Sequence, residues 1–234
     1  MKFGKGYWKS FREGIQREWV ITNGLGGYAG SSIIGANTRK HHGLLIASLH
    51  PPVQRHLILS KLNEEIHLNG RTYSFNATQR PTIIEEGHLH LQRFSYDKIP
   101  TFQYQVEDFF LTKKVALEYG KNTVGIAYSI ENGCSETTLN ITPLFNFRDH
   151  SQRIERAELR FEHKIEESNI ILVPEADKNV TITLHTTSGT IKPRITVFDE
   201  DMVYQTEIDT GMSAIDNHFT PYDIILNIAP FEKL

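Results

Sequence analysis

Alternation of apolar and polar residues is the feature that most constrains the fold of this chain. It recurs along residues 102–106, 115–119, 124–130, 139–145, 159–165 and 180–184. Successive side chains on a β-strand point to opposite faces, so this period predicts strands with one buried face. Turn-forming residues separate these runs. Among them, Asn69-Gly70 lies between two strand-like segments and predicts a hairpin with a two-residue loop.

Helical periodicity is weak, and short helices are expected only over residues 9–15 and 151–157. Many short strands with frequent turns favour an antiparallel arrangement over alternating strands and helices. A chain of 234 residues is long enough to bury a substantial core. We therefore predict a mainly β fold, a large antiparallel two-sheet β-sandwich with few short helices, which forms one domain over residues 1–234.

Composition argues against several classes of function. The formal charge of -3 predicts neither a nucleic-acid nor a membrane partner. No apolar run approaches the roughly 20 residues that span a bilayer. Cys134 is the only cysteine, so no internal disulfide can form. Because the N-terminus also lacks the apolar core of a signal peptide, we expect a cytoplasmic location.

A glycine-rich stretch, residues 23–28, follows a strand-like run, and we call it the glycine loop. Glycine at this density indicates backbone with positive φ or close approach by another group. Its spacing also fits a dinucleotide-binding loop, but residues 30–35 would form a poor helix and the next acidic residue is Glu64. We therefore expect a loop that meets another molecule and holds more glycine than folding alone requires.

The segment between Glu18 and Glu64 contains no acidic residue, whereas it holds four histidines together with Arg39 and Lys40. Such a segment predicts a positively biased surface, which is either simply solvated or a docking surface. Aromatic rings stack on sugars while amides and guanidinium groups bond their hydroxyls. Residues of those types lie close together here: Trp19, Asn23, Tyr28, Asn37 and Arg39.

No complete catalytic or metal site is evident from the residues. His88 and His90 would share one face of a strand, but no further ligand accompanies them at a convincing spacing. Adjacent carboxylates such as Glu64-Glu65 would face opposite sides of a sheet, so they do not form a glycosidase pair. We therefore expect no catalytic residue, no bound metal and no cofactor.

Two blocks, residues 18–28 and 37–45, resemble the N-terminal domain of glycogen debranching enzymes of bacterial and archaeal type. Later similarities occur at residues 51–55, 59–62, 100–102, 118–123 and 143–150, so the resemblance covers almost the whole chain. The resemblance implies a β-sandwich followed by a separate (α/α)6-barrel, whose acidic residues hydrolyse α-1,6-glucosidic branch points. The family commonly has Arg-Tyr-His where this chain has Lys40-His41-His42.

The resemblance implies a non-catalytic domain that packs on the catalytic barrel, in cis or as a split partner, and contributes to binding of α-glucan. A barrel of about 300 or more residues does not fit before Leu234, so we expect no hydrolysis by this chain alone. Alternatives are a free-standing carbohydrate-binding module for glycogen or maltodextrin and a purely structural domain. The residues expected at the substrate or docking surface are Asn23, Gly24, Gly26, Gly27, Tyr28, Asn37, Arg39 and His42.

Overall fold

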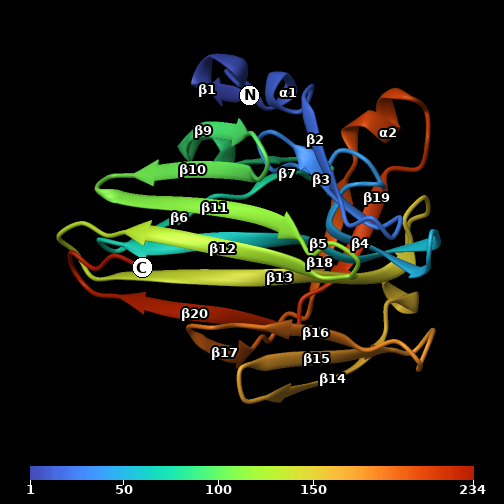
Figure 1. The fold of residues 1–234 in the computed structure, drawn as a ribbon. Helices are drawn as coiled ribbons and strands as arrows, with labels where there is room; N and C mark the ends of the chain where they lie inside the picture. The colour runs from blue at the N-terminus through green and yellow to red at the C-terminus, as the bar shows by residue number, and fades with distance from the viewer.

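A computed structural model describes residues 1–234 and contains two large antiparallel sheets that pack face to face (Figure 1). The smaller of these sheets has five strands in the order β1-β9-β10-β11-β12. Its strands are β1 (Lys2–Gly4), β9 (Leu91–Tyr96), β10 (Pro100–Val106), β11 (Phe109–Leu117) and β12 (Val124–Glu131).

The larger sheet has ten strands, seven of which follow the order β17-β20-β13-β5-β4-β3-β2. Strand β6 pairs with β5, β19 pairs with β13, and β18 pairs with β19. The central strands β5 and β13 are the longest and carry most of the pairing. The bounds are β2 (Glu18–Thr22), β3 (Tyr28–Ser32), β4 (Gly43–His50), β5 (Val53–Leu68), β6 (Arg71–Ser74), β13 (Thr137–Asp149), β17 (Thr190–Pro193), β18 (Phe198–Val203), β19 (Ile215–Phe219) and β20 (Tyr222–Ile228).

Smaller elements flank these sheets. A three-stranded sheet of β14 (Phe161–Glu166), β15 (Asn169–Pro174) and β16 (Ile182–His185) lies below β20 in Figure 1, and β7 (Ala77–Gln79) pairs with β8 (Ile84–Glu86). The helices are short, and none has the length and apolar character needed to cross a bilayer. They are η1 (Lys5–Tyr7), α1 (Phe11–Gly14), η2 (Gly87–His90), η3 (Arg156–Glu158) and α2 (Gln205–Asp209). The predicted mainly β two-sheet sandwich is therefore confirmed.

Period-two patterning explains how the two sheets share one core. In β10, buried residues alternate with half-exposed ones, and Phe102 packs against Phe94 of the neighbouring strand β9 with ring centroids 4.9 Å apart. Leu139 and Ile141 of β13 join these rings in a hydrophobic cluster of 39 buried residues. Burial of this apolar surface is the dominant stabilising contribution to such a fold.

The predicted hairpin at Asn69-Gly70 is confirmed. Leu68 of β5 lies opposite Arg71 of β6, and the two loop residues have φ values of 52° and 71°. Both residues therefore adopt the left-handed conformation that a type I′ turn requires, which asparagine and glycine tolerate better than other residues.

Glu64 and Glu65 face opposite sides of β5, as the sequence predicts for adjacent strand residues. Glu64 points into the sandwich, where its Oε1 accepts hydrogen bonds from Lys113 Nζ (2.5 Å) and Tyr128 OH (2.6 Å) of the smaller sheet. The pairing satisfies a charge that is costly to bury alone. It also ties β5 to β11 and β12 across the core.

Two local expectations need correction. The helix expected over residues 151–157 is wrong, because only the short 3-10 turn η3 forms there, capped reciprocally by Glu155 and Glu158. His88 and His90 lie in the 3-10 helix η2 and not on a strand, so they do not share a strand face. By contrast, the helix expected over residues 9–15 is present in shortened form as α1, with Ser10 Oγ accepting from Glu13 N (3.3 Å).

Candidate functional site

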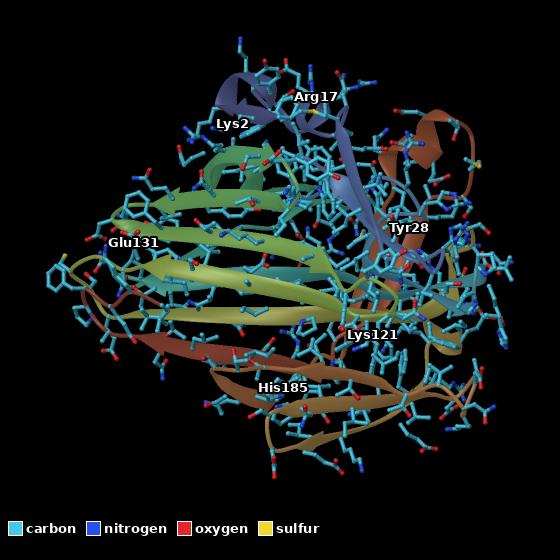
Figure 2. All side chains as sticks on the ribbon, viewed as in Figure 1. Lys2, Arg17, Tyr28, Lys121, Glu131 and His185 are labelled. Atoms are coloured by element: carbon cyan, nitrogen blue, oxygen red, sulfur yellow. The ribbon has the colours of Figure 1, made fainter.

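The glycine loop connects β2 to β3, and Asn23 anchors it. The buried Asn23 side chain accepts from Leu25 N (2.9 Å) and donates to Lys121 O (2.9 Å) and to Asn122 Oδ1 (3.2 Å). Its carbonyl also accepts from Gly120 N (2.7 Å). The β11–β12 turn therefore holds the loop, and Figure 2 places Tyr28 and Lys121 at the same end of the sandwich, away from Glu131.

The glycines of this loop are required by a positive φ or by close backbone contacts within the chain. Gly24 has a φ of +79°, and a Cβ there would lie 2.5 Å from the ring of Tyr119. Gly26 has a φ of +96°, and its Cβ would lie 2.4 Å from the carbonyl oxygen of Pro52. A Cβ on Gly27 would lie 2.8 Å from the carbonyl oxygen of Ile46. The expectation that the loop holds more glycine than folding requires is therefore wrong.

Tyr28 begins β3 and belongs to a small surface group that we call the imidazole cluster, formed by Tyr28, His41 and His150. The Tyr28 hydroxyl lies 3.2 Å from His150 Nδ1, and His41 Nδ1 lies 2.9 Å from the same atom. The rings of His41 and His150 have centroids 4.8 Å apart. Three segments that are distant in the sequence thus meet here.

The ionisation of the imidazole cluster follows from its partial burial. Burial lowers the pKa of His41, and it lowers the pKa of His150, which the neighbouring His41 reduces further. Burial also raises the pKa of Tyr28 to about 12. Near neutral pH the cluster therefore presents neutral rings that can donate and accept hydrogen bonds.

Asn37 and His42 lie at the ends of a second loop, residues 37–42, which we call the basic loop. Asn37 is buried; its Oδ1 accepts from Ser31 Oγ (2.8 Å) and its amide donates to Ser60 O (3.1 Å). His42 is also buried, and its Nδ1 accepts from Thr38 N (3.0 Å). Both side chains hold the backbone of the loop, and their hydrogen bonds stay within the chain.

Arg39 is exposed and forms an ion pair with Glu18 at the start of β2, with Nε 2.7 Å from Oε1. His42 Nε2 lies 3.5 Å from the same oxygen. Burial alone would raise the pKa of Glu18, but the hydrogen bonds from His42 and Arg39 lower that pKa to about 2. Glu18 and Arg39 also line a surface cleft of about 400 Å³ together with Arg12, Ile15, Gln16, Thr206 and Asp209.

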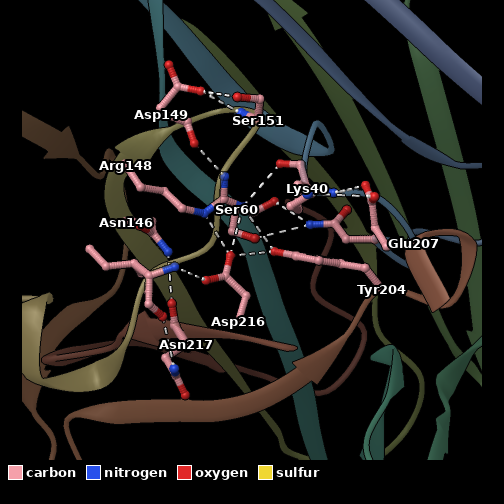
Figure 3. Close-up of polar contacts among 12 residues, drawn as sticks. Lys40, Ser60, Asn146, Arg148, Asp149, Ser151, Tyr204, Glu207, Asp216 and Asn217 are labelled. Atoms are coloured by element: carbon pink, nitrogen blue, oxygen red, sulfur yellow. Dashed lines mark hydrogen bonds and ion pairs between the residues drawn. The ribbon is translucent and has the colours of Figure 1, made fainter. Parts of the chain in front are cut away.

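A buried ionic network lies beneath the basic loop (Figure 3). Asp216 of β19 accepts from Arg148 Nε (2.8 Å) and from Tyr204 OH (2.8 Å), while Arg148 Nη2 donates to Lys40 O (3.1 Å). The side chains of Arg148 and Asp216 are 3% and 0% exposed. Glu207 of α2 completes the support, because its Oε1 accepts from Lys40 N (3.0 Å).

These supporting residues were not among the predicted site residues. Arg148 lies in the segment 143–150 that contributes to the family resemblance, but nothing in its neighbours indicates Asp216 as its partner. Glu207 and Glu18 lie outside the acid-free segment, and they neutralise part of its basic bias by pairing with Lys40 and Arg39. The basic face is therefore less positive than its sequence suggests.

The predicted residues therefore divide into a surface group and a group of buried supporting residues. Tyr28, Arg39 and part of the glycine loop reach the surface, whereas Asn23, Asn37 and His42 support it from inside. As for metal ligands, no group of three or more His, Cys, Asp or Glu side chains gathers in residues 1–234. His88 instead packs against Phe11, with ring centroids 5.9 Å apart.

Comparison with known proteins identifies the family of the chain. The family model described as the glycogen debranching enzyme N-terminal region matches residues 17–234, which include both loops and the buried network. No curated protein matches the chain. Because the family match covers most of its length, the chain belongs to the family of glycogen debranching enzyme N-terminal domains.

Proposed function

We propose that this chain is a non-catalytic domain that packs on the catalytic barrel of a glycogen debranching enzyme and contributes to binding of α-glucan. Family membership supports a catalytic partner. In this proposal residues 1–234 act as one domain, a free or covalently linked barrel supplies the hydrolytic carboxylates, and the exposed, unpaired Cys134 is compatible with a cytoplasmic location.

The observation that carries the proposal is the convergence of Tyr28, His41 and His150 on one exposed end of the sandwich. Their rings offer both apolar faces and hydrogen-bonding edges, a combination that is common in protein interfaces and sugar sites. The Arg148–Asp216 pair beneath the basic loop restricts its movement, so the face is organised before a partner arrives.

The remaining predicted residues fit this proposal in different ways. Gly24 and Gly26 allow the glycine loop to lie against the β4–β5 and β11–β12 turns, so they shape the face without contacting a partner through side chains. Arg39 is exposed and can reach a partner carboxylate or a glucan hydroxyl. Tyr119 is 85% exposed beside the loop and extends the same face with another ring.

Sedimentation velocity with a separately produced catalytic barrel domain of a glycogen debranching enzyme tests this proposal. We expect a one-to-one complex, and we expect the double variant Tyr28→Ala/His150→Ala to weaken association at least about tenfold, as loss of central interface residues does. The barrel should also show a lower KM for branched glucan when the chain is bound.

Lys164→Ala provides the matched control, because Lys164 is an exposed residue of β14 that pairs only with Glu166. It should leave association unchanged. No complex with the unmodified chain, or equal association of the double variant, would contradict the proposed docking face.

A further inference from the structure

The outer face of the larger sheet carries a second cleft of about 630 Å³, which we call the outer cleft. Its floor is made by polar side chains that alternate with core residues along the central strands. Asn63 and Glu65 of β5 face the cleft, and Thr142 of β13 lies opposite Asn63 in the register. The β7–β8 region and β18 supply walls through Arg80 and Asp199.

The size and lining of the outer cleft indicate a polar ligand. Its volume falls within the range of about 300–1,000 Å³ that is typical of small-molecule sites. Only three of its seventeen lining residues are hydrophobic, whereas most small-molecule sites are predominantly apolar. A ligand that fills this cleft must therefore form many hydrogen bonds with its lining residues.

The charges in the outer cleft argue against a strongly charged ligand of either sign. Arg80 makes a bidentate pair with Asp199, with both N–O distances 2.8 Å, and its Nε lies 2.9 Å from Glu85. Arg194 pairs with Asp223 at 2.6 Å. Because cations and anions are interspersed, an anionic ligand meets carboxylates and a cationic ligand meets guanidinium groups.

Several polar groups of the cleft are left without a partner in the chain. Ion pairs occupy Glu85 and Asp199 but not the carboxylate of Glu65. Thr220 lines the cleft and is 1% exposed, and its Oγ1 makes no hydrogen bond; neither does the buried Oδ1 of Asn63. Buried polar atoms are nearly always hydrogen-bonded, so these atoms point to a ligand that satisfies them.

We propose that the outer cleft is a saccharide-binding site that takes a segment of a neutral α-linked glucan. A sugar hydroxyl both donates and accepts, as Glu65, Asn63 and Thr220 require. The ring of Tyr73 also lines the cleft and can stack on a pyranose. The polyhydroxyl class follows from the cleft itself, and the choice of an α-glucan rests on the proposed function.

The outer cleft is separate from the imidazole cluster. Arg55, which donates to Gly26 O in the glycine loop (2.6 Å), and Asn63 of the cleft both lie on β5. Eight residue steps of strand separate them, a span of roughly 25 Å at about 3.3 Å per residue. The cleft would therefore hold a glucan segment apart from the face proposed to meet the barrel.

Calorimetric titration of this chain with maltoheptaose, without any barrel, tests the inference. We expect measurable binding that Glu65→Ala weakens at least about tenfold, because hydrogen bonds to a charged group contribute strongly. Thr72→Trp is the second variant. Thr72 is exposed at the rim, so a large ring there obstructs the cleft while the buried groups stay in place.

Glu136→Ala is the matched control, since Glu136 is an exposed carboxylate outside the cleft. It should bind maltoheptaose as the unmodified chain does. Absence of binding, or binding that resists both Glu65→Ala and Thr72→Trp, would overturn the inference. The titration contains no barrel and the sedimentation assay contains no sugar, so either proposal can fail while the other stands.

Discussion

The loop end of the sandwich and the outer cleft differ in how clearly local sequence motifs indicate them. The loop end combines the glycine loop and the basic loop, both of which are dense in unusual residues and close in sequence. The outer cleft draws Glu65, Arg80, Arg194 and Thr220 from strands and connections spread over much of the chain. No short stretch of sequence marks it.

The two regions also differ in what their polar residues bind. At the loop end, Asn23, Asn37 and His42 direct their hydrogen bonds to the chain itself. In the outer cleft, Asn63 and Thr220 leave polar atoms without internal partners. A dense motif can therefore reflect the demands of folding, while scattered residues can line an open cleft.

The largest effect is expected from Arg148→Ala, which tests whether the loop end depends on its buried network. The variant leaves Asp216 as an unpaired charge in the interior, and we expect the free energy of unfolding to fall by about 3–5 kcal/mol. Urea denaturation measures this change in the free energy of unfolding. Arg153→Ala removes an exposed pair, with side chains 44% and 59% exposed, and should cost less than about 1 kcal/mol. Equal losses of unfolding free energy in Arg148→Ala and Arg153→Ala would show that the buried network does not stabilise the fold.

Gly26→Ala tests whether the glycine loop is built for internal packing. The new methyl group would meet Pro52 O at 2.4 Å in a left-handed backbone, so we expect a loss of about 2–4 kcal/mol in unfolding free energy. Gly120→Ala is matched, because its φ is +78° but nothing lies within 4 Å, and it should cost about 1 kcal/mol. If urea denaturation finds the two variants alike, close packing is not the reason for Gly26.

Arg80→Lys tests whether the Arg80–Asp199 pair holds the wall of the outer cleft in place. Lysine keeps the charge but cannot make the bidentate pair with Asp199, so the wall loosens. We expect about 1–2 kcal/mol less stability and several-fold weaker maltoheptaose binding by calorimetry. The control Arg93→Lys alters an exposed residue outside the cleft and should change neither quantity. Unaltered affinity for maltoheptaose in Arg80→Lys would show that the Arg80–Asp199 pair does not contribute to the proposed binding site.

The smallest effect concerns the pH dependence contributed by Glu18. Its pKa is about 2 in the folded chain and near 4.5 without the fold, so the unfolded state takes up the proton first as the pH falls. The stabilisation is therefore fully present above about pH 4.5 and is lost as the pH falls towards 2. We expect Glu18→Gln to lower the urea midpoint at pH 7, with a difference from the unmodified chain that shrinks below pH 4.5. A constant difference across this range would contradict the assignment.

Local signals in the sequence were sufficient for several of the main strands and for the Asn69-Gly70 hairpin. The alternating run over residues 159–165, however, forms β14 without a buried face, and Tyr119 lies beyond the end of β11. Alternation reports which face of a strand is buried, and the turn residues must adopt positive φ wherever the hairpin forms. Short helices were harder to predict. The segment 151–157 forms only a 3-10 turn, and His88 lies in another, because packing outweighs weak local preferences in such short segments.

By itself, the sequence determined the mainly β class, the core-facing residues of the main strands and the family, since each depends on neighbouring residues or on one recognisable motif. Only the tertiary structure decided that the glycines serve internal contacts, that Arg148 meets Asp216, and that Glu65 lines a cleft with Thr220. These outcomes depend on the order and stacking of the strands. Arg148 and Asp216 lie 68 positions apart, and their pairing leaves no periodic pattern in the sequence. The same holds for Glu65 and Thr220, which line one cleft although distant in the chain.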